Sequence, residues 1–391
     1  MTTVRVGFIP LVDAAPLIVA HEMGFAGEEG ISLELVKAPS WSTIRDMLAF
    51  GGIDAAHMLA PVPVAISLGI GANAADLSAL MVLSVNGNVI GVSAELEHRL
   101  ADLGHEFGFD NAIVAGQDFA KAAATKPLKI GVPFPISMHA ELLYYWLSAS
   151  GLPAPQGVDV RTVPPPLMAD AIADGEIDAF CVGEPWGSKT VERGIGALLL
   201  PGSAIWSFAP EKVLAARTQW AEQEPDLTGR LMRAVWKASR WLGTEGTHTT
   251  TAELLSRSDY LNLPSEIIDR ALMGRIVVRP TGETRFSPSF VQFSDGAATF
   301  PWRSQAAWIG NQLAARLGMD RGAAMASAKS VFRSDLYRTH LKDTGAIMPG
   351  ASEKLEGGIE GGFAGASESG RLLLSENRFF DGAVFDPATK K

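Results

Sequence analysis

The sequence contains one cysteine, Cys181, among its 391 residues. A single thiol excludes an internal disulfide and any cysteine-rich metal or cluster site. The chain also lacks the run of about 18 apolar residues that a membrane-spanning helix requires. Basic residues are in the minority, because 33 Lys and Arg face 43 Asp and Glu and give a formal net charge of −10. Nucleic-acid phosphates are bound by clustered Lys and Arg, so we expect no direct nucleic-acid binding. The lack of a long apolar run leads us to expect no membrane span.

Sequence signatures of cofactor and metal sites are absent as well. There is no Gly-x-x-x-x-Gly-Lys-Ser/Thr loop for nucleotide phosphates, and no Gly-x-Gly-x-x-Gly follows a predicted strand. His21 is followed by Glu-Met-Gly and has no second histidine at helical spacing, so it is not half of a zinc pair. We therefore expect no cofactor and no metal ion.

The first ten residues, Met-Thr-Thr-Val-Arg-Val-Gly-Phe-Ile-Pro, lead directly into a predicted strand. They have no basic segment, no apolar segment and no cleavage site of the kind found in secretory signal peptides. Unless a leader has been removed, the sequence favours a cytoplasmic location. With 47% hydrophobic and 19% charged residues, the composition is typical of a soluble globular protein. The length allows two or more domains.

One short motif occurs twice in the chain. Residues 175–186 are Gly-Glu-Ile-Asp-Ala-Phe-Cys-Val-Gly-Glu-Pro-Trp, and residues 51–61 are Gly-Gly-Ile-Asp-Ala-Ala-His-Met-Leu-Ala-Pro. Gly, Ile, Asp, Ala and Pro coincide at a constant offset of 124 residues. Because several identities share one offset, we interpret the motif as a duplicated structural unit.

The segments before each motif have the same pattern of predicted elements. Both halves are predicted to run strand–helix–strand–helix–strand, which is typical of a parallel sheet with helices on its faces. The first half has strands at 4–9, 31–36 and 53–59 and helices at 14–24 and 41–50. The second has strands at 128–133, 158–163 and 177–182 and helices at 137–150 and 167–174. The fold class is therefore α/β, with two lobes that each contain a mostly parallel sheet flanked by helices.

The rest of the chain completes these lobes. Residues 80–93 are predicted to cross between the lobes as strands, so the first lobe spans 1–92 and the second 93–200. A largely helical return, 201–345, rejoins the first lobe, with its first helix predicted at 210–219. The tail, 346–391, is rich in Gly and Ser and is expected to be flexible or wrapped, with its apolar end at 378–387 packed on the body.

Two facing lobes of this kind form a cleft lined by the turns that follow the strands. These turns and the connecting segments contain donor groups: the Trp41 indole N–H, the Asn88 amide, His139 in the first turn of a helix, the peptide at Gly183 and the Lys212 cation. Donors, a cation and helix N-termini suit a small anion. They do not supply the base and nucleophile that an enzyme requires, so we expect no catalytic residues.

Each candidate also has a structural interpretation. Trp41 is nearly as well explained as a residue that anchors a helix start in the core, and a lone Lys212 is usually solvated. His139 is equally compatible with a surface histidine. Glu184 does not suit an anion site, so its carboxylate is expected to point away while neighbouring backbone N–H groups face the ligand. Cys181 is expected to be a small buried hydrophobic residue.

Several segments together resemble a known family. Residues 38–46 (Ala-Pro-Ser-Trp-Ser-Thr-Ile-Arg-Asp), 52–61, 183–186 (Gly-Glu-Pro-Trp), 210–214 (Pro-Glu-Lys-Val-Leu) and 297–302 (Ala-Ala-Thr-Phe-Pro-Trp) are similar to the nitrate/bicarbonate solute-binding proteins of ABC transporters. The similarity extends from about Val4 to the tail. It implies the two-lobe, type-II periplasmic-binding-protein fold and places the oxyanion contacts at Trp41, Asn88, His139, Gly183 and Lys212. Asn88 departs from the glutamine expected in nitrate binders.

Without an export signal, the chain resembles the cytoplasmic nitrate/nitrite sensors of the NasS type. That resemblance implies a small oxyanion ligand and an RNA-binding antiterminator of the NasT type as partner, which is released when the anion binds. Two alternatives stay open. One is a transporter subunit for nitrate or bicarbonate whose leader has been removed. The other is a biosynthetic enzyme on the same fold.

Overall fold

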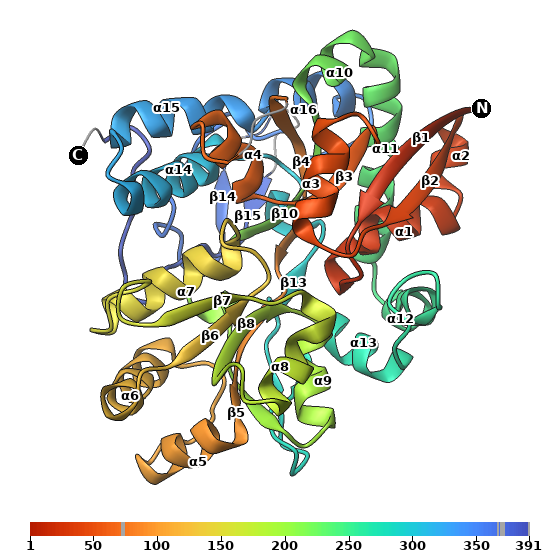
Figure 1. Ribbon diagram of the computed structural model, residues 1–391. Helices are drawn as coiled ribbons and strands as arrows, with labels where there is room; N and C mark the ends of the chain where they lie inside the picture. The colour runs from red at the N-terminus through yellow and green to blue at the C-terminus, as the bar shows by residue number, and fades with distance from the viewer. Residues whose placement is uncertain (72–74, 366, 368–371, 390–391) are drawn as a thin grey trace.

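The computed structural model describes residues 1–71, 75–365, 367 and 372–389. Two lobes, each built around a central sheet, lie one above the other (Figure 1). The first sheet is formed by β13 (Val291–Gln292), β4 (Leu77–Asn86), β10 (Pro210–Arg217), β3 (Ala55–Leu59), β1 (Thr2–Phe8) and β2 (Ile31–Lys37), in that order. The second is formed by β7 (Asp159–Thr162), β6 (Lys129–Val132), β8 (Ala179–Gly183), β5 (Asn88–Ser93) and β9 (Gly196–Pro201).

Helices surround both sheets (Figure 1). Those near the first sheet are α1 (Ala15–Glu22), α2 (Phe25–Glu28), α3 (Trp41–Ala49), α4 (Pro61–Ser67), α10 (Thr218–Gln223), α11 (Pro225–Leu242), α12 (His248–Ser256), α14 (Arg303–Leu317), α15 (Arg321–Val331) and α16 (Ser334–Leu341). Those near the second are α5 (Ala94–Asp102), α6 (Ala112–Thr125), α7 (Met138–Ala149), α8 (Met168–Ala173), α9 (Trp186–Glu192) and α13 (Ser265–Leu272). Two small hairpins pair β11 (Arg275–Val277) with β12 (Thr284–Phe286) and β14 (Phe363–Gly365) with β15 (Leu372–Leu374). No helix in the described part of the chain is both long and apolar enough to cross a membrane.

The duplicated motif has the same structural role in both lobes, as predicted. A β-carbon on Gly7 of β1 would lie 2.6 Å from Ile53 Cδ1, and one on Gly131 of β6 would lie 2.7 Å from Ile177 Cδ1. Both isoleucines are almost fully buried. Only a glycine in the first strand therefore lets the isoleucine of the motif pack against it. Gly7 with Ile53, and Gly131 with Ile177, are therefore packing pairs and not parts of a ligand site.

The aspartate of the motif joins the same two segments by hydrogen bonds. Asp54 Oδ2 accepts a hydrogen bond from the Arg5 N–H at 2.8 Å, and the Asp54 N–H donates to Arg5 O at 2.8 Å. In the second lobe Asp178 Oδ2 accepts from the Lys129 N–H at 2.9 Å, and the Asp178 N–H donates to Lys129 O at 2.8 Å. The repeat therefore fixes the register at which the third strand of each half enters the sheet.

Both sheets are mixed, whereas mostly parallel sheets were expected. In the first lobe β1 is parallel to β2 and β3, but β10 is antiparallel to β3 and β4. In the second lobe β6 is parallel to β7 and β8, but β5 is antiparallel to β8 and β9. The antiparallel strands β5 and β10 are those that follow a crossing between lobes. Each arrives from the other lobe and starts beside the residues at which its two antiparallel neighbours end.

The prediction of a helix at 210–219 was wrong, because Pro210–Arg217 form strand β10 and a short helix follows it. The chain crosses to the second sheet at Gly87 and returns between Pro201 and Pro210, compared with predicted boundaries after residues 92 and 200. Part of the return also packs on the second lobe, where the Leu198 N–H donates to Val278 O at 2.8 Å.

The two crossing segments are joined by one side chain. Asn86 Nδ2 donates to Ser207 O at 2.8 Å, and Asn86 Oδ1 accepts from the Ala209 N–H at 3.1 Å. Asn86 and Gly87 both have positive φ, 60° and 99°, a backbone region that asparagine and glycine tolerate better than other residues. The backbone conformation at this crossing therefore depends on its local sequence.

The C-terminal segment wraps over the body, and its apolar end packs there as predicted. Phe379 lies with its ring centroid 4.8 Å from that of Trp206 and 5.4 Å from that of Tyr145. The Tyr145 hydroxyl donates to Asp381 Oδ1 at 2.9 Å. Because Tyr145 belongs to α7 of the second lobe, this segment bridges the lobes. Parts of the predicted tail, 366, 368–371 and 390–391, lie outside the described residues.

A buried ion pair also joins the lobes. Arg316 of α14 donates to both carboxylate oxygens of Glu141 on α7, each at 2.6 Å. The Glu141 side chain is 1% exposed and that of Arg316 is 18% exposed. Such a bidentate pair holds its two helices in one orientation.

Replacing Arg316 by alanine should therefore lower the free energy of unfolding by about 3 kcal/mol, because Glu141 stays buried without its cation. Urea denaturation measures the change. The matched control is Arg161→Ala, which breaks a pair with Asp159 whose side chains are 42% and 53% exposed and should cost less than about 1 kcal/mol. Equal losses in the two variants would contradict a structural role for the inter-lobe pair.

Candidate functional site

The candidate site is centred on Lys212 of β10, whose side chain is fully buried between the lobes. Its Nζ lies 2.7 Å from Asp13 Oδ2 and 2.9 Å from Glu211 Oε1. Burial alone would lower the pKa of Lys212, but these two carboxylates raise it above its ordinary value. Lys212 is therefore cationic, and the helix-start position predicted for it was wrong. Its ammonium group forms ion pairs with two carboxylates of the protein.

Asp13 connects Lys212 to a histidine. It lies in a short 3-10 helix, Val12–Ala14, directly after β1, and His57 Nε2 is 2.9 Å from Asp13 Oδ1. Burial would raise the pKa of Asp13, but Lys212 and His57 together hold it below its ordinary range. Burial lowers the pKa of His57. The neutral His57 therefore carries its proton on Nε2 toward Asp13, while Nδ1 accepts from the Ile9 N–H at 3.5 Å. Both ring nitrogens of His57 are occupied within the protein.

The second lobe contributes Asn88 and His139. Asn88 opens β5 opposite Gly183 of β8, and its Nδ2 donates to Glu211 Oε2 at 2.7 Å. His139 is the second residue of α7, which Ser137 caps by accepting from the Ala140 N–H at 3.1 Å. Burial, and then the charge of Lys212, hold the pKa of His139 well below its ordinary value, so its ring is neutral. His139 Nδ1 lies 3.2 Å from Glu211 Oε1.

Two nitrogen atoms in this cluster lack a partner among the described residues: Trp41 Nε1, which is a donor, and His139 Nε2, which is a donor only when it carries the ring proton. Trp41 is the first residue of α3 and is 1% exposed. Its ring centroid lies 5.5 Å from Lys212 Nζ and 5.5 Å from the His57 ring centroid. Because buried donors without partners are rare, these atoms indicate where a ligand with acceptor atoms fits.

Gly183 borders the same space. A β-carbon on Gly183 would lie 3.0 Å from Leu11 Cδ2 and 3.6 Å from His139 Nε2. The peptide after it differs from expectation, because the Glu184 N–H donates to Gly87 O at 3.1 Å and so is not available to a ligand. The Glu184 carboxylate points away as expected and accepts from the Ser188 N–H.

The structure thus brings Trp41, Asn88, His139, Gly183 and Lys212 together. Sequence reasoning missed three members of the cluster: Asp13, His57 and Glu211. The signal that identifies them is their burial beside Lys212, which residue type alone does not give. Among the described residues, no group of three or more His, Cys, Asp or Glu side chains is arranged to hold a metal ion.

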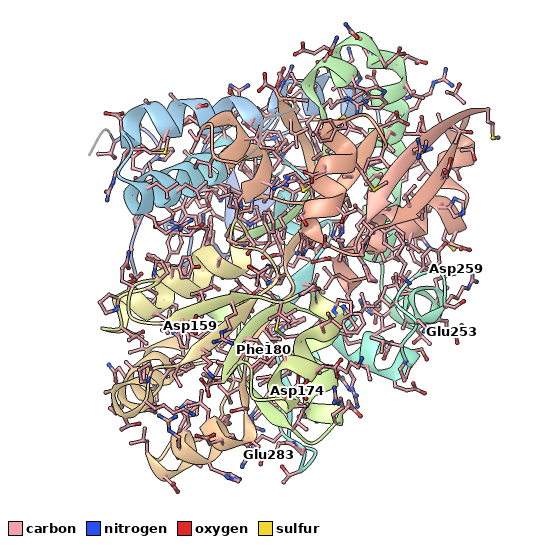
Figure 2. All side chains as sticks on the ribbon, viewed as in Figure 1. Asp159, Asp174, Phe180, Glu253, Asp259 and Glu283 are labelled. Atoms are coloured by element: carbon pink, nitrogen blue, oxygen red, sulfur yellow. The ribbon has the colours of Figure 1, made fainter. Side chains whose placement is uncertain are left out.

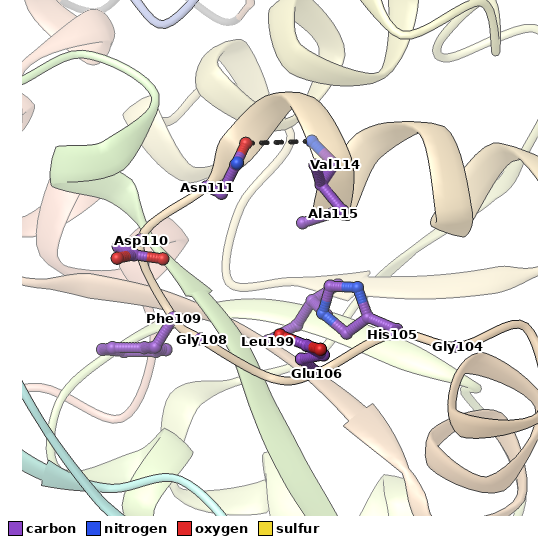
Figure 3. Close-up of a pocket in the computed structure, with 10 residues that line it drawn as sticks. All are labelled: Gly104, His105, Glu106, Gly108, Phe109, Asp110, Asn111, Val114, Ala115 and Leu199. Atoms are coloured by element: carbon purple, nitrogen blue, oxygen red, sulfur yellow. Dashed lines mark hydrogen bonds between the residues drawn. The ribbon is translucent and has the colours of Figure 1, made fainter.

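The cluster is closed to solvent, and none of the five cavities found elsewhere includes one of these residues. Figure 3 shows a cavity of about 280 Å³ in the second lobe, at the start of α6, where Asn111 Oδ1 accepts from the Val114 N–H at 3.1 Å. Glu106 and Asp110 line it. Their carboxylates repel an anion, so this cavity is a poor oxyanion site.

Comparisons with known proteins agree with this architecture. The sequence model of the NMT1-like family matches residues 1–256. The chain belongs to this family. The nitrate/nitrite binding protein NrtA of Nostoc sp. is 31% identical over 99% of this chain and 83% of its own. The bicarbonate-binding protein CmpA of Synechococcus elongatus is 27% identical over 98% of this chain and 84% of its own.

A solved structure extends the likeness to three dimensions. The crystal structure of the periplasmic nitrate-binding protein NrtA from Synechocystis matches with a TM-score of 0.85 and 28% identity, over 100% of this chain and 97% of that one. This match confirms the two-lobe, type-II periplasmic-binding-protein fold. It also confirms the resemblance to the solute-binding proteins of ABC transporters at the level of the family.

The buried Glu184 gives a pH-dependent contribution to stability. Burial raises its pKa from 4.5 to about 7. The folded protein therefore keeps a proton that the unfolded chain has already lost, and stability falls as the pH rises from about 4.5 to about 7. At about 1.4 kcal/mol per pH unit the fall is at most about 3 kcal/mol.

Replacing Glu184 by glutamine should remove this fall. The free energy of unfolding of the variant should therefore rise relative to that of the unchanged protein between pH 5 and pH 8. Urea unfolding at several pH values measures the two profiles. Glu253→Gln, at an exposed position of α12 (Figure 2), should leave the profile of the unchanged protein intact. A fall that persists in Glu184→Gln would assign the titration to another group.

Proposed function

We propose that this chain binds nitrate or nitrite between its lobes and has no catalytic step. The observation that carries the proposal is the pair of unpartnered buried nitrogen atoms, Trp41 Nε1 and His139 Nε2, beside the Lys212 cation. Tryptophan can only donate through its indole nitrogen, so the ligand atom facing it must be an acceptor. Nitrate and nitrite are small anions whose oxygens are all acceptors. The relatives named as nitrate-binding proteins support the same class of ligand.

Ligand exchange requires the lobes to separate. Lys212, His57, His139 and Glu211 are each 0% exposed. A nitrate ion therefore enters an open form and stabilises the closed one, which is the hinge mechanism of two-lobe binding proteins. The crossing segments near Asn86 and Ser207 are the places where the backbone rotates.

The proposal includes a cytoplasmic sensor role, in which the closed form releases an RNA-binding antiterminator of the NasT type. It rests on the resemblance to sensors of the NasS type. Exposed carboxylates on the second lobe, such as Asp159 and Asp174 (Figure 2), disfavour RNA on this surface, so contact with RNA is left to the partner. Delivery of the anion to an ABC transporter is the alternative. Similarity to a nitrate import ATP-binding protein of Synechocystis supports it.

Replacing Trp41 by phenylalanine should weaken nitrate binding roughly 10- to 100-fold, because one hydrogen bond to a charged ligand is lost. Calorimetric titration with nitrate measures the change. The fold should persist, since Trp41 Nε1 has no partner among the described residues. Trp302→Phe is the matched control, because Trp302 is 2% exposed and its Nε1 is likewise unpartnered. Equal binding by the two variants would contradict the site, and no heat with nitrate or nitrite would contradict the ligand.

Capture of the antiterminator tests the sensor role. The immobilised chain should retain a NasT-type protein without nitrate and release most of it when nitrate saturates the site, because the partner prefers the open form. Trp41→Phe should still retain the antiterminator at a nitrate concentration that releases it from the unchanged protein. Capture that ignores nitrate, or no capture at all, would contradict the sensor role and leave the transport alternative.

A further inference from the structure

The charges around Lys212 do not suit an added anion. One buried cation faces two buried carboxylates, Asp13 at 2.7 Å and Glu211 at 2.9 Å. Both histidines of the cluster are neutral, because burial lowers their pKa values. With both carboxylates ionised the cluster already carries one negative charge, and nitrate would add a second inside a site with no solvent access. Like charges at such distances are strongly unfavourable in a buried environment.

The hydrogen bonds of His139 lead to the same difficulty by a separate route. A neutral imidazole has one donor nitrogen and one acceptor nitrogen. An anion with only acceptor atoms requires the proton on Nε2. The lone pair of Nδ1 then faces Glu211 Oε1 at 3.2 Å, where an ionised carboxylate repels it. A proton on Glu211, or a second proton on His139, removes the conflict.

We infer that Glu211 determines which anions this site accepts, and that an acceptor-only anion such as nitrate binds together with one proton from solvent, held between Glu211 Oε1 and His139 Nδ1. The inference rests on the proposed function. The proton adds to the carboxylate, which becomes a donor to Nδ1 and loses its charge. Because the proton and nitrate enter together, the cluster keeps its single negative charge when nitrate binds.

The groups that face Glu211 identify it as the place for the proton. They are Lys212 on the same strand, Asn88 on β5, His139 on α7, Asp13 after β1 and Cys181 on β8. Asp13 is bound to Lys212 and, on its other side, to His57, which keeps it ionised. Burial raises the pKa of Cys181 well above its ordinary value, so the thiol stays neutral. Burial also raises the pKa of Glu211.

Coupling between anion binding and proton uptake distinguishes two classes of oxyanion. Nitrate and nitrite must take a proton from solvent, so their binding weakens as the pH rises. An anion that carries its own hydroxyl group can instead donate to the acceptor nitrogen of His139 while Glu211 stays ionised. Glu211 is therefore a specificity-determining residue, in addition to the donors that hold the anion.

The test is calorimetric titration of the full chain with sodium nitrate between pH 6 and pH 9. The dissociation constant should rise about tenfold per pH unit in the upper part of this range. At fixed pH, buffers of different ionisation enthalpy should show uptake that approaches one proton per nitrate. Glu211→Gln, which is neutral and can donate to His139 Nδ1, should flatten the pH dependence. Buffer dependence in the unchanged protein provides the same test without a variant.

Glu184→Gln is the control, because Glu184 is also buried, has a pKa raised to about 7 and contacts Ser188 instead of the cluster. It should keep the slope of the unchanged protein. A dissociation constant independent of pH, with no proton uptake, would overturn the coupling while leaving nitrate binding intact. A slope lost in Glu184→Gln and kept in Glu211→Gln would also overturn it. Absence of nitrate binding at every pH would instead overturn the proposed function.

Discussion

The closed form of this protein depends on a buried lysine that cannot be buried alone. Moving an ammonium group out of water costs several kcal/mol, and only close partners of opposite charge offset that cost. Lys212 has two such partners, Asp13 and Glu211. Because Glu211 also accepts from Asn88 across the cleft, the same carboxylate that neutralises the cation draws the second lobe onto the first. The neutralisation of Lys212 and the contact between the lobes therefore depend on the same carboxylate, that of Glu211.

The two halves of the duplicated backbone carry different functional groups at equivalent positions. Asn88 and Lys212 are separated by the same 124 residues as the repeated motif, and each lies near the start of a strand that has just crossed between lobes. His57 and Cys181 have the same separation. One half thus supplies a cation and a histidine where the other supplies an amide and a thiol. A symmetric scaffold in this way holds an asymmetric cluster of side chains.

The repeat made much of the fold predictable, because its Gly–Ile packing and Asp hydrogen bonds are local and occur twice. β10 was not predictable, since Glu, Lys, Leu, Ala and Arg in 210–217 all favour a helix and only pairing with β3 and β4 overrides that preference. The five candidate residues followed from their turns and the family resemblance, and the structure brings them together. Asp13 and Glu211 did not, because an acid beside an anion site is explained only by a cation whose position depends on β10.

Helix α7 links the cluster to the outer surface of the lobe interface. Its N-terminal turn holds His139, the next residues include Glu141, bound to Arg316, and one turn further Tyr145 is bound to Asp381. A helix of this length moves as a rigid body, so any shift of His139 on ligand entry also acts on the contacts of Glu141 and Tyr145. The C-terminal segment and α14 therefore contact the same helix that holds His139. The closed form is stabilised from two sides, by the charge cluster within the cleft and by the bridging contacts outside it.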